Sequence, residues 1–271
     1  MDWSSFQVIA IMAIGLTGGV LGGLLGLGGS VFIIPALTFL LGTNQHLYQA
    51  AALIANVFVA VAATNRHRGR GTIRRDIVPA MALATTGAAV AGVLISNLFS
   101  PKPLAAVFGV FLCFAAISEL IALIRRVPDC ATTPDARCPL PLAVGIGLTG
   151  GFASGLLGIG GGAIMVPLLR KFGRLPLRQA VASSAAAMIV ACAVGALAKN
   201  LSIATLTTPD GTPLTTRESL MLAGLLAPLA MVGGTIGAAL VYRLPIDATR
   251  LVLSILLAFA GVRMILTGIG W

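Results

Sequence analysis

The chain has 271 residues, of which 58% are hydrophobic and only 10% are charged, whereas an ordinary soluble domain has about 25% charged residues. Because so few charges cannot cover a globule of this length in water, the composition excludes a water-soluble fold. The net charge of +10 does not indicate a nucleic-acid partner, since the basic residues lie between apolar runs and lack the interleaved aromatic side chains that stack on bases.

Apolar runs follow one another along the whole chain, separated by short polar segments. Most have the length of about 20 residues that an α-helix needs to cross a bilayer, whereas the second and the seventh are too short. No run shows the alternation of polar and apolar residues that marks a transmembrane β-barrel. The sequence therefore predicts an all-α polytopic membrane protein embedded in the lipid bilayer. The runs lie at residues 6–24, 30–41, 48–64, 77–98, 103–124, 140–157, 162–169, 179–198, 219–242 and 248–269.

An internal repeat is the strongest feature of the chain. Residues 18–37 read GGVLGGLLGLGGSVFIIPAL and residues 150–169 read GGFASGLLGIGGGAIMVPLL, so that ten of twenty positions are identical at a shift of 132. A weaker match aligns Gln49-Ala50 with Gln179-Ala180. We therefore expect a first transmembrane repeat over residues 1–124, a cytoplasmic linker over 125–139 and a second repeat over 140–271.

The basic residues predict how the repeats lie in the membrane. If each glycine-rich segment crossed once, the better orientation would place ten basic residues inside and seven outside. If each segment instead turns back, as a re-entrant hairpin or short helix pair, fourteen of the eighteen gather inside, as the positive-inside rule prefers. Each half then has an odd number of passes, which gives inverted repeats as in secondary transporters. This predicts that both termini lie outside. We separately expect the protein in the inner membrane of a bacterial cell. The inside segments are 65–76, 125–139, 170–178 and 243–250.

The two glycine runs, residues 26–30 and 158–162, predict broken helices. Each glycine costs up to about 1 kcal/mol relative to alanine in a helix. The short helices that follow would begin inside the bilayer, where free N–H groups and the positive end of the helix dipole attract anions. The alternative is that these glycines only allow close helix packing. The residues predicted to bind a small anion here are Gly28, Gly29, Ser30, Gly160, Gly161 and Gly162.

The paired G-L-L-G-[LI]-G-G-x5-P segments, each followed by Q-A-x-A, resemble the TauE/SafE family of sulfite exporters. The resemblance covers both halves and implies a permease that moves sulfite, organosulfonates or related sulfur anions, usually outward. The stretch from Gln179 to Ser184 matches the small and polar residues of the family. The first half departs from that pattern, with Leu53-Ile54 at the positions of Ser183-Ser184, and Asn56 one turn onward could take over the polar role.

Few polar side chains fall inside the apolar runs. Asn56, Ser183 and Ser184 follow the glycine segments and could line the anion pathway or bond neighbouring helices. Arg263 is a further candidate for substrate binding, and Glu119 aligns beside it when Phe114 is matched to Phe259. Both charged side chains could also reach the membrane interface by extending along their helices.

The predicted activity is potential-driven uniport, because a monoanion leaving a cell gains about 2.3 kcal/mol per 100 mV of inside-negative potential. A proton could still accompany the anion. An anion channel and a permease for another small solute are the alternatives. An intramembrane hydrolase, suggested by Ser154-Gly155 and Gly29-Ser30, would need a base, and His46 and His67 are predicted to lie in loops. We expect no catalytic residue, cofactor or metal site, and we interpret Cys130 and Cys138 as free thiols. A homo-oligomer and a monomer are both compatible with the sequence.

Overall fold

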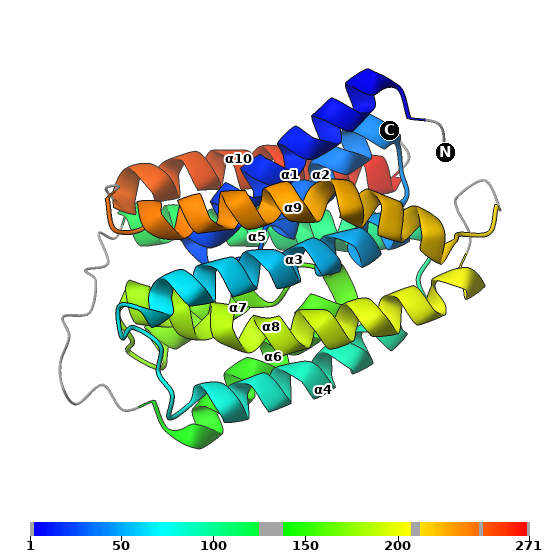
Figure 1. Ribbon diagram of the computed structural model, residues 1–271. Coiled ribbons are helices and arrows are strands. Elements are labelled where there is room, and N and C mark those ends of the chain that lie inside the picture. Colours follow the sequence, from blue (N-terminus) through cyan, green and yellow to red (C-terminus); the bar gives the residue numbers. More distant parts are fainter. Residues whose placement is uncertain (1–2, 125–137, 207–211, 244–245, 270–271) are drawn as a thin grey trace.

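The computed structural model describes residues 3–124, 138–206, 212–243 and 246–269, and the regular elements in these ranges are helices (Figure 1). Seven of them are long and apolar enough to cross a membrane, which confirms the predicted all-α membrane fold. Most of the predicted linker, 125–137, which includes Cys130, lies outside the described residues. The helices are α1 (Ser5–Leu25), α2 (Ser30–Leu41), α3 (Gln45–Arg68), α4 (Val78–Ser96), α5 (Pro101–Ile124), α6 (Leu140–Leu157), α7 (Gly162–Lys171), α8 (Leu177–Ser202), the 3-10 turn η1 (Ile203–Thr205), α9 (Thr216–Leu240) and α10 (Ile246–Ile269).

Both glycine segments break the helix, as predicted. Helix α1 ends where Gly26 adopts φ = 67°, and α6 ends where Gly158 adopts φ = 75°. These left-handed conformations are readily available only to glycine, because a Cβ atom would meet the following carbonyl. The chain then turns back, and the short helices α2 and α7 pack against α1 and α6, respectively (Figure 1). Each glycine segment is therefore the tip of a helical hairpin inside the protein.

Glycine also sets the closest helix contacts between the two halves. Along α1 and along α6, one glycine per turn faces the backbone of a helix from the other half, where an added Cβ would collide with a carbonyl oxygen. Such small-residue stripes let helices approach closely in lipid. The pairs are Gly15, Gly19 and Gly23 with Leu226, Ala230 and Gly234 of α9, and Gly147, Gly151 and Gly155 with Met81, Thr85 and Ala89 of α4.

These pairs also give the helix directions. Residue numbers rise together in both stripes, so α1 is parallel to α9 and α6 is parallel to α4. The central helices α3 and α8 are antiparallel, because the start of α3 contacts the end of α8. Helix α3 therefore runs opposite to α8, and the contacts between α1 and α9 recur between α6 and α4.

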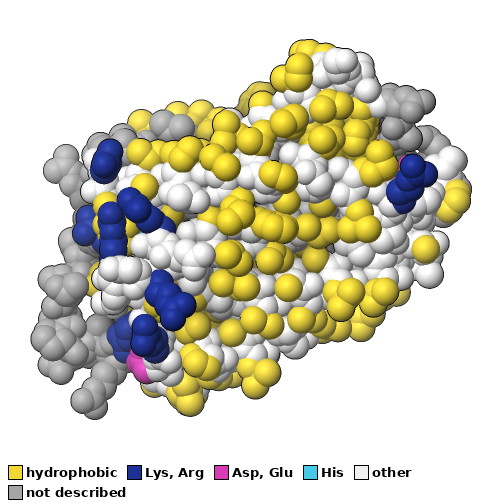
Figure 2. All heavy atoms as spheres, in the orientation of Figure 1, with side chains coloured by type: hydrophobic (Ala, Val, Ile, Leu, Met, Phe, Trp, Pro, Cys, Tyr) yellow, Lys and Arg dark blue, Asp and Glu magenta, His cyan; other side chains and the backbone are white. Residues whose placement is uncertain are grey.

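The basic side chains gather at one end of the helix bundle. Figure 2 shows most of the Lys and Arg side chains of the visible face at the left end, with hydrophobic side chains over the middle and one basic group at the right. The loop after α3 and the turns after α7 and α9 lie at that left end, whereas α1 begins and α10 ends at the right (Figure 1). This is the arrangement expected when each glycine segment turns back rather than crosses.

Candidate functional site

The two hairpin tips touch in the middle of the protein, between α3 and α8. A Cβ atom on Gly28 would lie 2.8 Å from the Ile159 carbonyl oxygen of the other tip. A Cβ on Gly160 would lie 2.9 Å from Nδ2 of Asn56, and one on Gly162 would collide with the Gly26 carbonyl oxygen. Only glycine leaves room for this contact, which we call the glycine crossing.

Asn56 of α3 caps the first short helix. Its Oδ1 accepts a hydrogen bond of 3.2 Å from the Ser30 N–H, and its Nδ2 donates one of 2.8 Å to the Ser30 hydroxyl. Both residues are fully buried. The pair thus satisfies one of the N–H groups that a helix leaves without an intrahelical acceptor at its start.

The start of the second short helix is different. The N–H groups of Ile164 and Met165 donate to the Gly161 carbonyl, but those of Gly162 and Ala163 have no acceptor among the described residues. The thioether of Met188 occupies this place, with its sulfur 2.8 Å from the position of a Cβ on Gly162. Sulfur is a weak acceptor, so α7 presents uncapped donors inside the protein.

Met188 is the counterpart of Asn56 in the second half. The tip glycines show this, since Gly26 lies against Val181 of α8 and Gly158 lies against Gln49 of α3, a shift of 132. The match of Gln49-Ala50 to Gln179-Ala180 is therefore displaced by two residues, and Ser183 and Ser184 correspond to Ala51 and Ala52. Contact with the glycine tips, rather than local identity, defines which residues are equivalent.

Of the remaining predicted site residues, some lie at the glycine crossing and others lie away from it. Gly29 and Gly161 precede the short helices and pack against the α1 and α6 backbones. The Ser184 hydroxyl donates to the Val181 carbonyl oxygen at 3.1 Å and lies 3.5 Å from the Gly26 carbonyl oxygen, beside the crossing. Ser183 instead accepts a bond of 3.1 Å from the Arg74 N–H and anchors the loop after α3. Arg263 is exposed on α10, with its guanidinium 4.9 Å from the centroid of the Phe39 ring, away from the crossing.

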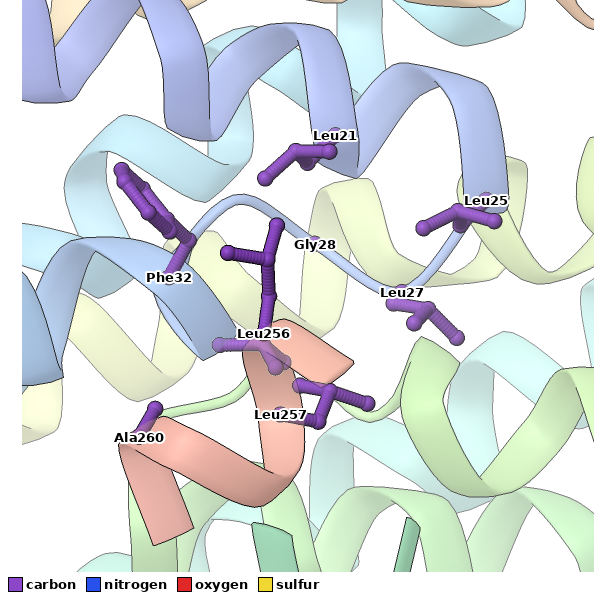
Figure 3. A pocket seen from close by; sticks show the side chains of 9 residues that line it. Leu21, Leu25, Leu27, Gly28, Phe32, Leu256, Leu257 and Ala260 are labelled. Atoms are coloured by element: carbon purple, nitrogen blue, oxygen red, sulfur yellow. The ribbon is translucent and has the colours of Figure 1, made fainter. Parts of the chain in front are cut away.

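A small apolar pocket lies beside the first hairpin tip, on the side that faces α10. Figure 3 shows leucine side chains, Phe32 and the backbone of Gly28 around it. Its cavity volume of about 20 Å³ has room for about one water molecule. Such a pocket is too small and too apolar to hold an oxyanion.

Three buried basic residues were missed or misplaced by sequence reasoning. His46 and His67 were predicted in loops, but they lie in the first and last turns of α3 and are 1% and 0% exposed. Lys199, one of the four basic residues outside the predicted inside segments, lies in α8 at the end opposite the basic loops and is 0% exposed. Each sits at the polar end of a long apolar run, where residue type alone does not tell which way the side chain points.

Comparisons with known proteins agree on a membrane transporter family. Residues 11–264 match the family model described as sulfite exporter TauE/SafE. The chain is 25% identical to the probable membrane transporter protein YunE of Bacillus subtilis, over 98% of this chain and 99% of that protein. It is 26% identical to the probable membrane transporter protein MamO of Magnetospirillum gryphiswaldense, over 98% of this chain but only 46% of that longer protein.

A probable membrane transporter protein of Xylella fastidiosa is 35% identical, over 65% of this chain and 67% of that protein. No solved structure matches the chain significantly.

Proposed function

The chain belongs to the sulfite exporter TauE/SafE family, and from this premise we propose that it exports a small sulfur-containing anion, sulfite or an organosulfonate. The basic end of the bundle would face the cytoplasm of a bacterial cell, in line with the positive-inside rule. The anion would bind at the glycine crossing on its way out.

The uncapped start of α7 is the observation that carries the proposal. The N–H groups of Gly162 and Ala163 point from the positive end of a helix dipole into a site without a protein acceptor. Backbone donors of this kind bind small oxyanions, and bare glycine lets the ligand approach them. Because the donors are backbone N–H groups and not lysine or arginine side chains, the anion binds weakly enough to be released.

Met188 supports a gating role at the same place. Its methyl group lies 2.6 Å from the position of a Cβ on Gly160 and 3.1 Å from that of a Cβ on Gly28, so its side chain fills the space between the tips. A methionine side chain has flexible, unbranched geometry and can change rotamer at low cost. We propose that an anion displaces the Met188 side chain and takes the uncapped N–H groups.

Transport would be driven by the membrane potential. An anion that moves from an inside-negative compartment releases about 2.3 kcal/mol per charge at 100 mV, so export needs no coupled ion. A single site between two hairpins can then work as a uniporter that exposes the anion to one side at a time.

Purified protein in liposomes tests this proposal. The liposomes are loaded with sulfite, sulfate, thiosulfate or methanesulfonate, and a potassium gradient with valinomycin sets the potential. We expect saturable efflux of sulfite or a sulfonate that is faster when the interior is negative. Efflux that does not saturate would indicate a channel, and efflux no faster than from protein-free liposomes for every anion would refute the proposed function.

A further inference from the structure

Lys199 forms a buried polar cluster at the end of the bundle opposite the basic loops. Its Nζ lies 2.9 Å from His46 Nδ1, 2.8 Å from the Ser96 hydroxyl and 2.7 Å from Asn97 Oδ1. No carboxylate contacts this nitrogen in the part of the chain that the structure describes. We call these residues the lysine cluster.

The hydrogen bonds show that Lys199 is the donor to all three partners. Ser96 gives its own proton to the Val93 carbonyl, and His46 Nε2 lies 3.0 Å from the Phe99 carbonyl, which can only accept. Asn97 Nδ2 donates to Ser202, so its oxygen faces the lysine. Three acceptors suit the three N–H groups of an ammonium, so the neutral partners around Lys199 are arranged for its charged form.

A second cluster lies at the basic end of the same two helices. His67 Nδ1 lies 2.8 Å from the Tyr242 hydroxyl. The guanidinium carbons of Arg70 and Arg178 lie 3.6 Å and 4.9 Å from the centroid of the Tyr242 ring. Both arginines are exposed, and neither contacts a carboxylate among the residues described. We call these residues the arginine cluster.

The two clusters are equivalent in the two halves of the protein. Positions in α3 and α8 are equivalent at a shift of 132, so Arg178 is the counterpart of His46 and Lys199 is the counterpart of His67. The α4 residues that contact α6 and the α9 residues that contact α1 are related by a shift of 145 in residue number. Tyr242 is therefore the counterpart of Asn97. Each cluster therefore joins a histidine and a cation from α3 and α8 to a polar side chain that follows α4 or α9.

The clusters flank the glycine crossing at equal distances. Along both α3 and α8, ten residues separate the crossing residue from one cluster and eleven separate it from the other, or about 15–16 Å at 1.5 Å per residue. The crossing residues are Asn56 and Met188. A basic side chain, Lys199 or Arg178, thus lies at each end of the helix pair that carries the crossing.

We propose that the two clusters are a pair of oxyanion sites, which the transported anion occupies before and after it passes the glycine crossing. This inference rests on the proposed function. At the lysine cluster the anion replaces a neutral acceptor of Lys199, such as Asn97, with a stronger charge-assisted bond. At the arginine cluster it binds the guanidinium groups, whose planar donors suit oxyanions. In the structure the arginine cluster is open to solvent and the lysine cluster is closed.

Face-specific kinetics test the proposal. Sulfite uptake into inside-out vesicles samples the basic end, and uptake into right-side-out vesicles samples the other. We expect Arg178→Met to raise the half-saturating sulfite concentration tenfold or more in inside-out vesicles and less than twofold in right-side-out ones. Lys199→Met should do the reverse. A charge-assisted hydrogen bond contributes enough for such a change.

Matched controls remove the same charge at the same ends. Arg66→Met and Lys102→Met replace exposed basic residues outside the clusters and should change neither value more than twofold. Because Lys199→Met removes a buried network, Asn97→Asp is the second variant. This variant places a fixed carboxylate beside Lys199. If the cluster is only structural, uptake should not change. If it is an anion site, the carboxylate should block it and raise the half-saturating sulfite concentration from that face at least tenfold.

Sulfate binding to the purified protein separates this inference from the proposed function. Sulfate should raise the melting temperature of the wild type and of the two controls, and less so in Arg178→Met and Asn97→Asp. Equal stabilisation of wild type and cluster variants, or variants that alter both faces alike, would overturn the inference. Absence of anion flux in wild-type vesicles would instead refute the proposed function, and the sulfate titration would still decide whether the clusters bind anions.

Discussion

At the scale of single residues, the two halves differ most where they meet. Asn56 and Met188 occupy equivalent positions, but the first caps α2 through Ser30 while the second leaves the start of α7 without an acceptor. An anion site needs donors that the protein itself does not satisfy, and one capped helix beside one uncapped helix provides them. The difference between the two helix starts therefore depends on two side chains, Asn56 and Met188.

Restoring the symmetry should remove the site. In Met188→Asn, the amide can cap the N–H groups of Gly162 or Ala163 as Asn56 caps Ser30, and it then competes with the anion. We expect sulfite flux in liposomes to fall at least tenfold, whereas Met188→Leu keeps an apolar side chain and most of the flux. Unchanged flux in Met188→Asn would show that the uncapped donors do not bind the substrate.

The tip glycines make a second prediction at this scale. Valine at Gly28 or Gly160 would adopt a positive φ and place its Cβ against Ile159 or Asn56. Such a backbone conformation costs about 1–3 kcal/mol by itself. We expect Gly28→Val and Gly160→Val to insert into the membrane but to lose anion transport, measured as flux per inserted protein. Gly87→Val is the control, because a Cβ at Gly87 meets nothing within 4 Å. Native transport by both tip variants would refute the backbone site.

At the scale of helices, the glycine stripes decide how the halves dock. Helix α6 rests on α4 through Gly147, Gly151 and Gly155, and α1 rests on α9 in the same manner. Helices in lipid gain little from apolar burial alone, so close backbone packing must hold them together. The hairpins that carry the tips are therefore positioned by helices of the opposite half.

A stripe substitution should loosen this docking. Leucine at Gly151 would push its Cβ into the Thr85 carbonyl oxygen, and neither backbone can yield within a packed helix pair. Overpacking of this kind costs about 1–3 kcal/mol or more. We expect Gly151→Leu to lower the melting temperature in detergent by several degrees. Gly145→Leu, on the same helix with open space at its Cβ, should leave it within a degree. Equal melting temperatures would show that the stripe does not hold α6 on α4.

At the scale of the whole molecule, the distribution of charge gives the protein two unlike ends. Arginine side chains gather at the end with the loop after α3, while at the opposite end Lys199 is buried among neutral partners. From the positive-inside rule we propose that this arginine-rich end faces the cytoplasm. On the proposed direction of export, the anion would enter at the end where Arg70 and Arg178 are exposed.

Cysteine labelling tests this orientation. Arg75 is exposed in the loop after α3 and Lys102 is exposed at the start of α5. In a variant whose four native cysteines are replaced by serine, Lys102→Cys should react with an impermeant maleimide in intact cells. Arg75→Cys should react only after the membrane is permeabilised. The opposite pattern would reverse the proposed direction of export.

The sequence by itself determined the lipid solvent, the helical class and the break at each glycine segment. Composition and short-range backbone preference control these features, and both can be counted along the chain. The returning path of each hairpin also follows from the sequence, because loop charges record which segments share an end. The division into a first repeat over 1–124 and a second repeat over 140–271 remains a prediction.

Only the tertiary structure decided which side chains meet. A helix turns by about 100° per residue, so adjacent serines such as Ser183 and Ser184 point to a distant loop and to the crossing, respectively. The burial of Lys199 depends on acceptors contributed by α3 and α4, more than one hundred residues away in the chain. Contacts of this kind arise from packing among many helices, and no local pattern encodes them.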